Sequence, residues 1–349
     1  MSNRNCLRFL RRVLASATLA TVTFAAAQAE EVNVYSYRQP QLVEPLFDAF
    51  TRETGITVNT IFAKDGLIER MAAEGQNSPA DVLLTTDISR LSQAVSLGIT
   101  QKVNSDVLDK SIPASYRGAD NNWFALTLRA RVIYASRDRV QQDTITYADL
   151  ADPKWRGKIC TRSGQHDYSL GLIASIIAHE GAAKAQAWLD AVRTNLAHKP
   201  SGNDRNQVKS IFAGECDLAL GNTYYMGLME TNDKEPEQKE WAKAVKVLFP
   251  NAQDRGTHVN VSGMVMAKNA PHPDTARKLM EFLAGTEAQR IYAEVNHEYP
   301  VTPGVEASER VRSWGTLKAD QLPLDEIAKN RKAASELVDK VGFDEGPSS

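Results

Sequence analysis

The sequence predicts an α/β protein built from two lobes, and three features of the chain carry this prediction. From Glu31 onward, apolar residues recur alternately at strand spacing and at helix spacing. Short β-rich segments take turns with these helical segments, which is the order that produces a mostly parallel sheet. About 320 residues follow the N-terminal segment, enough for two compact domains at the usual 100 to 200 residues each.

The first 29 residues, which precede this pattern, predict a signal peptide. They hold four arginines and no acid, then an apolar run, then the small-residue cleavage pattern Ala27-Gln28-Ala29. No later stretch approaches the roughly 20 apolar residues that a membrane span requires. We therefore expect a mature protein that is exported to the periplasm, is not embedded in a membrane and is monomeric.

The first lobe is predicted to comprise residues 30–130 and 258–305. Three segments read as strands because they are short and β-rich, and the segments between them have helical spacing. The predicted strands are Val32–Tyr37, Ile56–Phe62 and Asp81–Thr85, and the helices include Leu67–Glu74 and Ile88–Leu97. After a second crossing, Val259–Ala267 reads as a strand, and a helix opens at Pro273 and runs through Leu283.

The second lobe is predicted to comprise residues 131–257 and 306–349. Its strands are Lys158–Arg162 and Asp217–Leu220, and its helices are Ser169–His179, Ala182–Asn195 and Asp204–Ala213, followed by C-terminal amphipathic helices. Crossings near residues 128–134 and 257–265 make a two-stranded hinge. Because ligands of open α/β sheets bind outside the carboxyl ends of strands, we expect the site in the cleft between the lobes.

Charge and cysteine content restrict the partners and the compartment. Removal of the signal-peptide arginines takes the formal charge from −2 to about −6, which argues against a nucleic-acid partner. Cys160 and Cys216 remain in the mature chain, and an oxidising compartment favours a disulfide between them. Such a bond would close a loop of about 57 residues and stabilise the fold by roughly 4 kcal/mol. Two buried free thiols remain the alternative.

Tyrosines gather at the predicted strand ends. Tyr224 and Tyr225 follow the strand Asp217–Leu220, and at a helix start their side chains lie about 100° apart and can converge. Tyr168 precedes a helix at the same end of the sheet, and Tyr37 ends the first strand of the other lobe. The helix N-terminus also favours the phenolate forms of Tyr224 and Tyr225, and all four tyrosines are candidate metal ligands. Packing of an interlobe surface is the alternative role.

Phenolate is a hard anionic oxygen donor, and only a strongly Lewis-acidic ion deprotonates several phenols. Fe³⁺ meets this requirement. Ca²⁺ and Mg²⁺ would call for sets of carboxylates, and zinc or copper for His/Cys clusters, which the sequence does not display. The tyrosines therefore predict a ferric site.

Three phenolates leave an octahedral ion incomplete, and donors near the predicted cleft can hold an anion in the open positions. The candidates are Arg38, Gln39, Arg129, Arg131 and Ser163, with the backbone amides of Ser163 and Gly164. Arginine forks and N–H groups neutralise a small bidentate oxyanion such as carbonate. Ordinary interlobe salt bridges are the alternative for the arginines.

Several segments spread along the mature chain resemble periplasmic ferric-ion-binding proteins of the FbpA type. They are Val34-Tyr35-Ser36-Tyr37-Arg38-Gln39-Pro40, Pro79–Thr85, Arg129–Tyr134, Gly202-Asn203-Asp204-Arg205, Asn222-Thr223-Tyr224-Tyr225, Gly256-Thr257-His258 and Asn296-His297-Glu298-Tyr299-Pro300. The resemblance implies the class II periplasmic-binding-protein fold and delivery of ferric iron to an ABC permease and its ATPase. It also implies iron ligation by Tyr168, Tyr224 and Tyr225, anion binding by Arg38, Arg129 and Ser163, and weaker parts for Asn203 and Asn222.

One departure from the family concerns the first strand. Members with a first-lobe histidine carry it where this chain has Tyr37-Arg38-Gln39, so the chain resembles the tyrosine-rich, anion-dependent subgroup. The alternative within the binding class is a small organic cation such as a polyamine or thiamine, which tyrosine faces could bind. The sequence has no Gly-x-Ser-x-Gly elbow and no His-Glu-x-x-His helix, so we expect a binding protein and not an enzyme.

Overall fold

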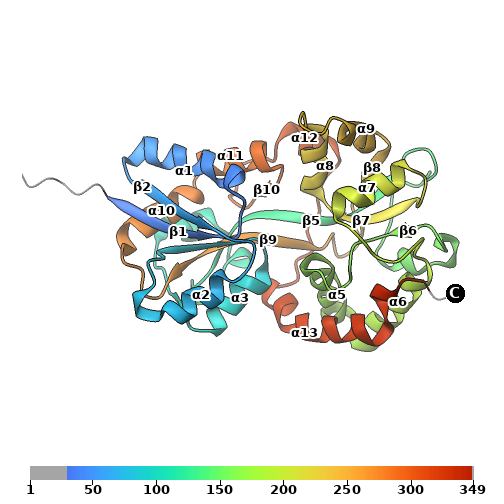
Figure 1. Ribbon diagram of the computed structural model, residues 1–349, viewed down its shortest axis with the longest axis horizontal. Coiled ribbons are helices and arrows are strands. Elements are labelled where there is room, and N and C mark those ends of the chain that lie inside the picture. Colours follow the sequence, from blue (N-terminus) through green and yellow to red (C-terminus); the bar gives the residue numbers. More distant parts are fainter. Residues whose placement is uncertain (1–29, 348–349) are drawn as a thin grey trace, which may run out of the picture.

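The computed structural model describes residues 30–347, and the predicted signal peptide at residues 1–29 lies outside this part of the chain. Two lobes are joined by the long strands β5 (Phe124–Ser136) and β9 (Val259–Ala267), which run side by side between them (Figure 1). No helix within residues 30–347 combines the length and apolar character that a bilayer span requires.

The sheet of the first lobe is mixed. β1 (Glu31–Ser36) pairs in parallel with β2 (Thr57–Phe62) and β3 (Val82–Thr85), whereas β9 is antiparallel to both β3 and β5. The expectation of a mostly parallel sheet is therefore wrong for the strands that reach the hinge. β5 leaves this lobe and β9 returns to it, so two adjacent strands must run in opposite directions. The short β4 (Thr100–Gln101) and β10 (Tyr299–Pro300) pair with β9 and β5.

Helices cover this sheet, and local chemistry sets several of their ends. α1 (Pro40–Thr54) starts at a proline, whose fixed φ suits the first turn, and ends at Gly55, whose φ of 75° suits glycine. α3 (Ile88–Ser96) is capped by Asp87, whose side chain accepts from the Ser89 N–H at 2.7 Å. The others are α2 (Leu67–Glu74), α4 (Asp106–Ser111), α10 (Pro273–Leu283) and α11 (Thr286–Asn296).

In the second lobe β7 (Leu218–Asn222) pairs with β5 and with β6 (Ile159–Cys160), and β8 (Val245–Leu248) also pairs with β5. The predicted disulfide between Cys160 and Cys216 is confirmed, with the Cα atoms 5.9 Å apart. The bond links β6 to the residues just before β7. The helices are α5 (Asp167–Glu180), α6 (Ala182–Thr194), α7 (Asp204–Phe212), α8 (Thr223–Glu230), α9 (Glu237–Lys243), α12 (Glu309–Ser313) and α13 (Leu324–Val341).

β5 changes partners part-way along its length. It pairs with β9 through Arg129 and Ala130, and with β7 from Arg131 onward. The chain therefore passes from one sheet to the other between residues 130 and 131. The lobe boundaries given above stay a prediction.

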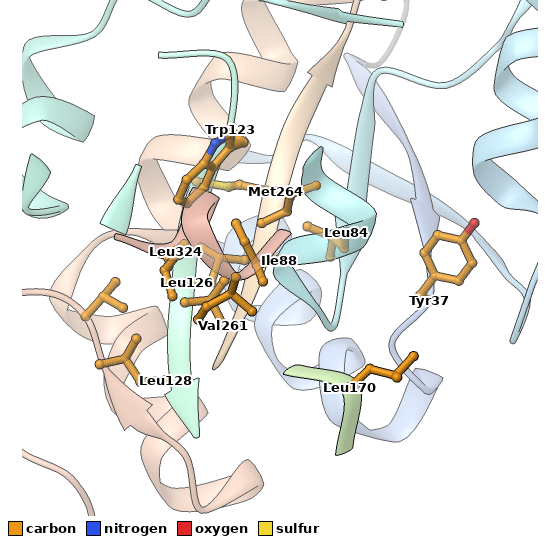
Figure 2. Close-up of a cluster of buried hydrophobic side chains, with 14 of the residues drawn as sticks. Tyr37, Leu84, Ile88, Trp123, Leu126, Leu128, Leu170, Val261, Met264 and Leu324 are labelled. Atoms are coloured by element: carbon orange, nitrogen blue, oxygen red, sulfur yellow. The ribbon is translucent and has the colours of Figure 1, made fainter. Parts of the chain in front are cut away.

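The largest apolar cluster packs on these strands. In Figure 2 the buried side chains of Leu126, Val261 and Met264 lie together on β5 and β9, and Tyr37 lies apart from them. Full burial of one such side chain stabilises the fold by about 1.5 to 3 kcal/mol. The strands that carry the hinge are thus also anchored in the core.

Candidate metal centre

Three of the four candidate tyrosines come together. Tyr168 lies in the first turn of α5, and Tyr224 and Tyr225 lie in the first turn of α8. The hydroxyl oxygens of Tyr168 and Tyr224 are 3.1 Å apart, and the ring centroids of Tyr224 and Tyr225 are 4.3 Å apart at an interplanar angle of 30°. Two helix starts from different parts of the sequence therefore bring three phenols to one place.

The residues before each helix explain this placement. α8 follows β7 without a loop, because Asn222 is extended and Thr223 is already helical, which puts both tyrosines in the first turn. α5 begins after a turn in which the Nδ1 atom of His166 accepts from the Tyr168 N–H at 3.2 Å. The positive end of each helix dipole faces the phenols and favours their charged form.

Three guanidinium groups surround the phenol rings. The carbon at the centre of the Arg129 guanidinium is 5.3 Å from the Tyr168 ring centroid, and that of Arg162 is 5.2 Å from it. Arg205 lies 5.0 Å from the Tyr225 ring centroid. Positive charge around oxygen atoms that become anionic stabilises them, so the surroundings suit phenolates.

Burial works in the opposite direction. It raises the pKa of Tyr224 well above the ordinary value for a phenol, and it raises the pKa of Tyr225 to about 12, with neighbouring phenols adding to the effect. Both side chains are therefore neutral at physiological pH in the protein alone. A bound cation has to displace their protons, which restricts the site to strongly Lewis-acidic ions.

The predicted anion-binding arginines are buried near the tyrosines. Arg129 donates to the Ser262 hydroxyl at 3.0 Å and lies 3.9 Å from the Asp87 carboxylate. Arg38 forms a buried ion pair with Glu298, which also accepts from Thr127. Burial opposes the charge of Arg38, but the Glu298 carboxylate outweighs it and raises the pKa of Arg38. The Nε atom of each arginine is buried and has no partner within residues 30–347.

Other predicted residues lie elsewhere. The Ser163 hydroxyl and the Gly164 N–H both donate to the Asp344 carboxylate near the C-terminus, so a carboxylate of the chain itself occupies these predicted anion donors. Gln39 is exposed and bonds to Gln41. Asn203 caps α7.

Tyr37 also has another partner. Its hydroxyl oxygen accepts from the Ile68 N–H at 2.8 Å, at the start of α2, and the Arg90 guanidinium lies 4.0 Å from its ring centroid. Its role as a ligand stays a prediction, in which the oxygen would either share its lone pairs between the metal and the Ile68 N–H or leave that amide. Tyr35 on β1 is a core residue and is 1% exposed.

A cavity of about 570 Å³ has a lining that comes from α2 and α3 on one side and from α5 and α13 on the other, and of the four candidate tyrosines Tyr37 alone lines it. Asp167, next to Tyr168, lines it together with Tyr37, Arg90 and Arg331. Arg331 pairs with Asp167 and also donates to Ser89 of α3 at 3.4 Å. No group of three or more His, Cys, Asp or Glu side chains suited to a metal occurs in the described part of the chain.

Sequence reasoning missed two of the surrounding arginines, Arg162 and Arg205. Arg162 opens the turn before Tyr168, and Arg205 belongs to the segment Gly202-Asn203-Asp204-Arg205. Both positions could have been read as cleft residues, because each lies where a strand or turn meets a helix start. Their place against the phenol rings depends on the fold.

Comparison with known proteins decides the family. Residues 35–290 match the model described as bacterial extracellular solute-binding protein. The chain belongs to this family. The chain is 42% identical over 327 residues to iron uptake protein A1 of Synechocystis sp., and the match covers 93% of this chain and 90% of that protein. It is 29% identical to the major ferric iron-binding protein of Neisseria gonorrhoeae, with 96% and 98% covered.

Solved structures of solute-binding proteins agree with the fold. Apo ferric ion-binding protein A of Pasteurella haemolytica is 51% identical, with a TM-score of 0.85 over 90% of this chain and 99% of that one. A Trichodesmium protein solved with iron and citrate is 41% identical, with a TM-score of 0.86 and the same coverage. The class II periplasmic-binding-protein fold and the resemblance to FbpA-type proteins are thereby confirmed. This solute-binding family serves ABC transporters.

Proposed function

We propose that this protein binds ferric iron in the periplasm through the phenolates of Tyr168, Tyr224 and Tyr225, and delivers it to an ABC permease and its ATPase. The observation that carries the proposal is the convergence of the three phenols, with the Tyr168 and Tyr224 oxygens 3.1 Å apart. As neutral phenols, Tyr168 and Tyr224 share a single hydrogen bond at this distance. A trivalent ion replaces their protons and turns the cluster into a hard anionic ligand set.

A synergistic anion completes the proposed site. Arg129 lies near Asp87, and Arg131 and Arg162 both pair with Asp204, while Arg205 lies over the Tyr225 ring; these four guanidinium groups and two buried carboxylates leave two positive charges in excess. Fe³⁺ with three phenolates is formally neutral, so a dianion such as carbonate balances this excess. The Nε atom of Arg129, which has no partner among the described residues, is a donor for it. Ser163 joins only if Asp344 withdraws.

Closure of the two lobes is the proposed signal to the transporter. The cavity lined by Tyr37 and Asp167 has walls from both lobes, and Arg331 of α13 already reaches Ser89 of α3. Binding free energy that favours the closed arrangement shifts the lobe equilibrium toward it. Hinge opening, loss of the anion or protonation of the phenols then releases iron.

The test is a titration of the purified mature protein with ferric citrate and bicarbonate, followed by visible absorption. Wild type is expected to develop a phenolate-to-iron charge-transfer band that saturates near one iron per chain. The Tyr224→Phe/Tyr225→Phe variant is expected to lose it, whereas Tyr116→Phe, a matched loss of a half-buried phenol hydroxyl, keeps it. A wild-type protein without a band refutes the proposal.

The runner-up ligand, a small organic cation, meets an unfavourable surface. The faces of Tyr37, Tyr168 and Tyr225 are already covered by arginine guanidinium groups, which repel a second cation. Titration calorimetry with spermidine and thiamine tests this alternative. Saturable binding of either, combined with the absence of a charge-transfer band, would favour it over iron.

A further inference from the structure

Asp204, the first residue of α7, has a completely buried side chain with three strong partners. Its Oδ2 atom accepts from the Arg131 guanidinium at 2.8 Å and from the Asn222 backbone N–H at 2.8 Å. Its Oδ1 atom accepts from the Arg162 guanidinium at 3.0 Å. The Asn222 side-chain oxygen also accepts from Arg131, at 3.3 Å. One carboxylate thus joins three separate segments of the chain.

Each of these segments leads directly to a phenol or to the hinge. Asn222 is the last residue before α8, so its amide fixes where Tyr224 and Tyr225 begin. Arg162 lies 5.2 Å from the Tyr168 ring centroid. Arg131 is the first β5 residue paired with β7. The Asp204 carboxylate therefore links the segment that precedes Tyr168 directly to the segment that precedes Tyr224.

We propose that Asp204 is a positioning residue of the metal site, which holds the Tyr168 phenol in register with the Tyr224 and Tyr225 phenols. The inference rests on the proposed ferric site. Asp204 does not touch iron. It fixes the two arginines and the Asn222 amide so that the three phenol oxygens meet without rearrangement when the ion arrives, which avoids the entropic cost of ordering them at that moment.

The charge of Asp204 acts against the phenolates, and this opposition makes the inference testable. The carboxylate raises the pKa of Tyr224 and of Tyr225, after the larger contributions from burial and neighbouring phenols. If Asp204 acted through charge alone, its neutralisation would strengthen iron binding. If it acts by positioning, neutralisation weakens iron binding, because one amide oxygen cannot accept from two guanidinium groups and a backbone N–H in the same geometry.

The first variant is Asp204→Asn, which keeps the shape of the side chain and removes its charge. The matched control is Asp81→Asn, because Asp81 is also fully buried and accepts from the Asn33 and His272 N–H groups, away from the tyrosines. Both variants are loaded with ferric citrate and bicarbonate, and the band intensity is divided by the bound iron measured independently. Iron release to a chelator is timed by stopped flow.

Asp204→Asn is expected to lower the absorbance per bound iron by about a third, because one of three phenolates is lost. It is also expected to speed iron release at least about tenfold. Asp81→Asn is expected to keep the wild-type absorbance and release rate, even where its urea midpoint is lower. Absorbance per bound iron counts phenolates on folded molecules, so a purely stabilising role would leave it unchanged.

Unpaired guanidinium groups can unfold Asp204→Asn, and a second variant covers that case. Adding Arg131→Met to the same chain removes one of the two charges and leaves the introduced amide oxygen for Arg162 and the Asn222 N–H. If the double variant regains the wild-type urea midpoint while its absorbance per bound iron stays low, the positioning role is supported. The inference is overturned if a folded variant keeps both the wild-type absorbance per bound iron and the wild-type rate of iron release. Tighter iron binding in either variant also overturns it. A wild-type protein that shows no band overturns the proposed ferric site itself.

Discussion

Iron affinity is expected to depend steeply on pH, because iron has to displace phenol protons. A phenol with a pKa of about 12, such as Tyr225, is ionised in roughly one molecule in 10⁵ at neutral pH. Each ligand that exchanges a proton for iron contributes a tenfold change in affinity per pH unit. Three such ligands give an affinity that rises about a thousandfold per pH unit, and about thirtyfold over half a unit. Acid therefore releases iron.

The measurement is competition with a chelator of known proton dependence, at fixed free Fe³⁺ and free carbonate activities, over roughly one pH unit around neutrality, so that the phenols alone set the slope. Tyr168→Phe removes one proton-exchanging ligand, so its affinity is expected to rise only about a hundredfold per pH unit. Tyr116→Phe keeps the wild-type slope. An affinity that does not vary with pH, or a Tyr168→Phe slope equal to that of wild type, refutes the assignment of three phenolates.

Three further outcomes are expected. Replacing Cys160 and Cys216 by alanine should cost about 4 kcal/mol of unfolding free energy in urea, since the bond spans 56 residues, and a loss below about 1 kcal/mol would contradict the chain-entropy reasoning. Gly227→Ala should cost about 1 to 3 kcal/mol, because an added Cβ would lie 2.4 Å from the Cγ atom of His297; in a His297→Ala background this cost should shrink without vanishing, since the Cβ atom that alanine keeps there still lies 2.7 Å away, and simple additivity would count against the contact. Tyr37→Phe should leave the absorbance per bound iron unchanged, because the Tyr37 hydroxyl bonds to the Ile68 amide; a decrease would show that Tyr37 turns to the metal.

The regular elements could be predicted where the apolar period is long. The helix Leu67–Glu74, the strand Val259–Ala267 and the helix Pro273–Leu283 have the bounds that the sequence predicts. Periodicity over several turns, a proline at the first helical position and a following glycine act locally, so they are visible in the sequence alone.

Features that depend on distant partners were not predictable in this way. Ser163 reads as an anion donor in its own turn, but its partner Asp344 lies 181 residues along the chain. β8 (Val245–Leu248) is four residues long and exists through its pairing with β5. The direction of the Tyr37 hydroxyl is likewise set by α2 and not by the first strand.

The candidate site was predicted through its tyrosines more fully than through its charges. Tyr168, Tyr224 and Tyr225 each follow a strand end, and parallel topology brings such positions together. Arg162 and Arg205 sit in segments that look like ordinary helix and strand ends. Whether an arginine covers a phenol or a surface carboxylate depends on side-chain directions that composition and period do not contain.

The position of Arg129 and Arg131 links the charge of the site to the motion of the lobes. Arg129 is among the last β5 residues paired with β9, and Arg131 is the first paired with β7, so the two guanidinium groups flank the point where the strand leaves one sheet for the other. Arg129 is bonded to Ser262 and lies near Asp87 on one side of this point, whereas Arg131 is held by Asp204 on the other. An anion that engages Arg129 while the phenols engage iron therefore joins groups anchored in both sheets. In the proposed site, loss of that anion would remove a connection across the hinge and would take ligands from the ion in one step, so anion exchange would be a route to release without unfolding either lobe.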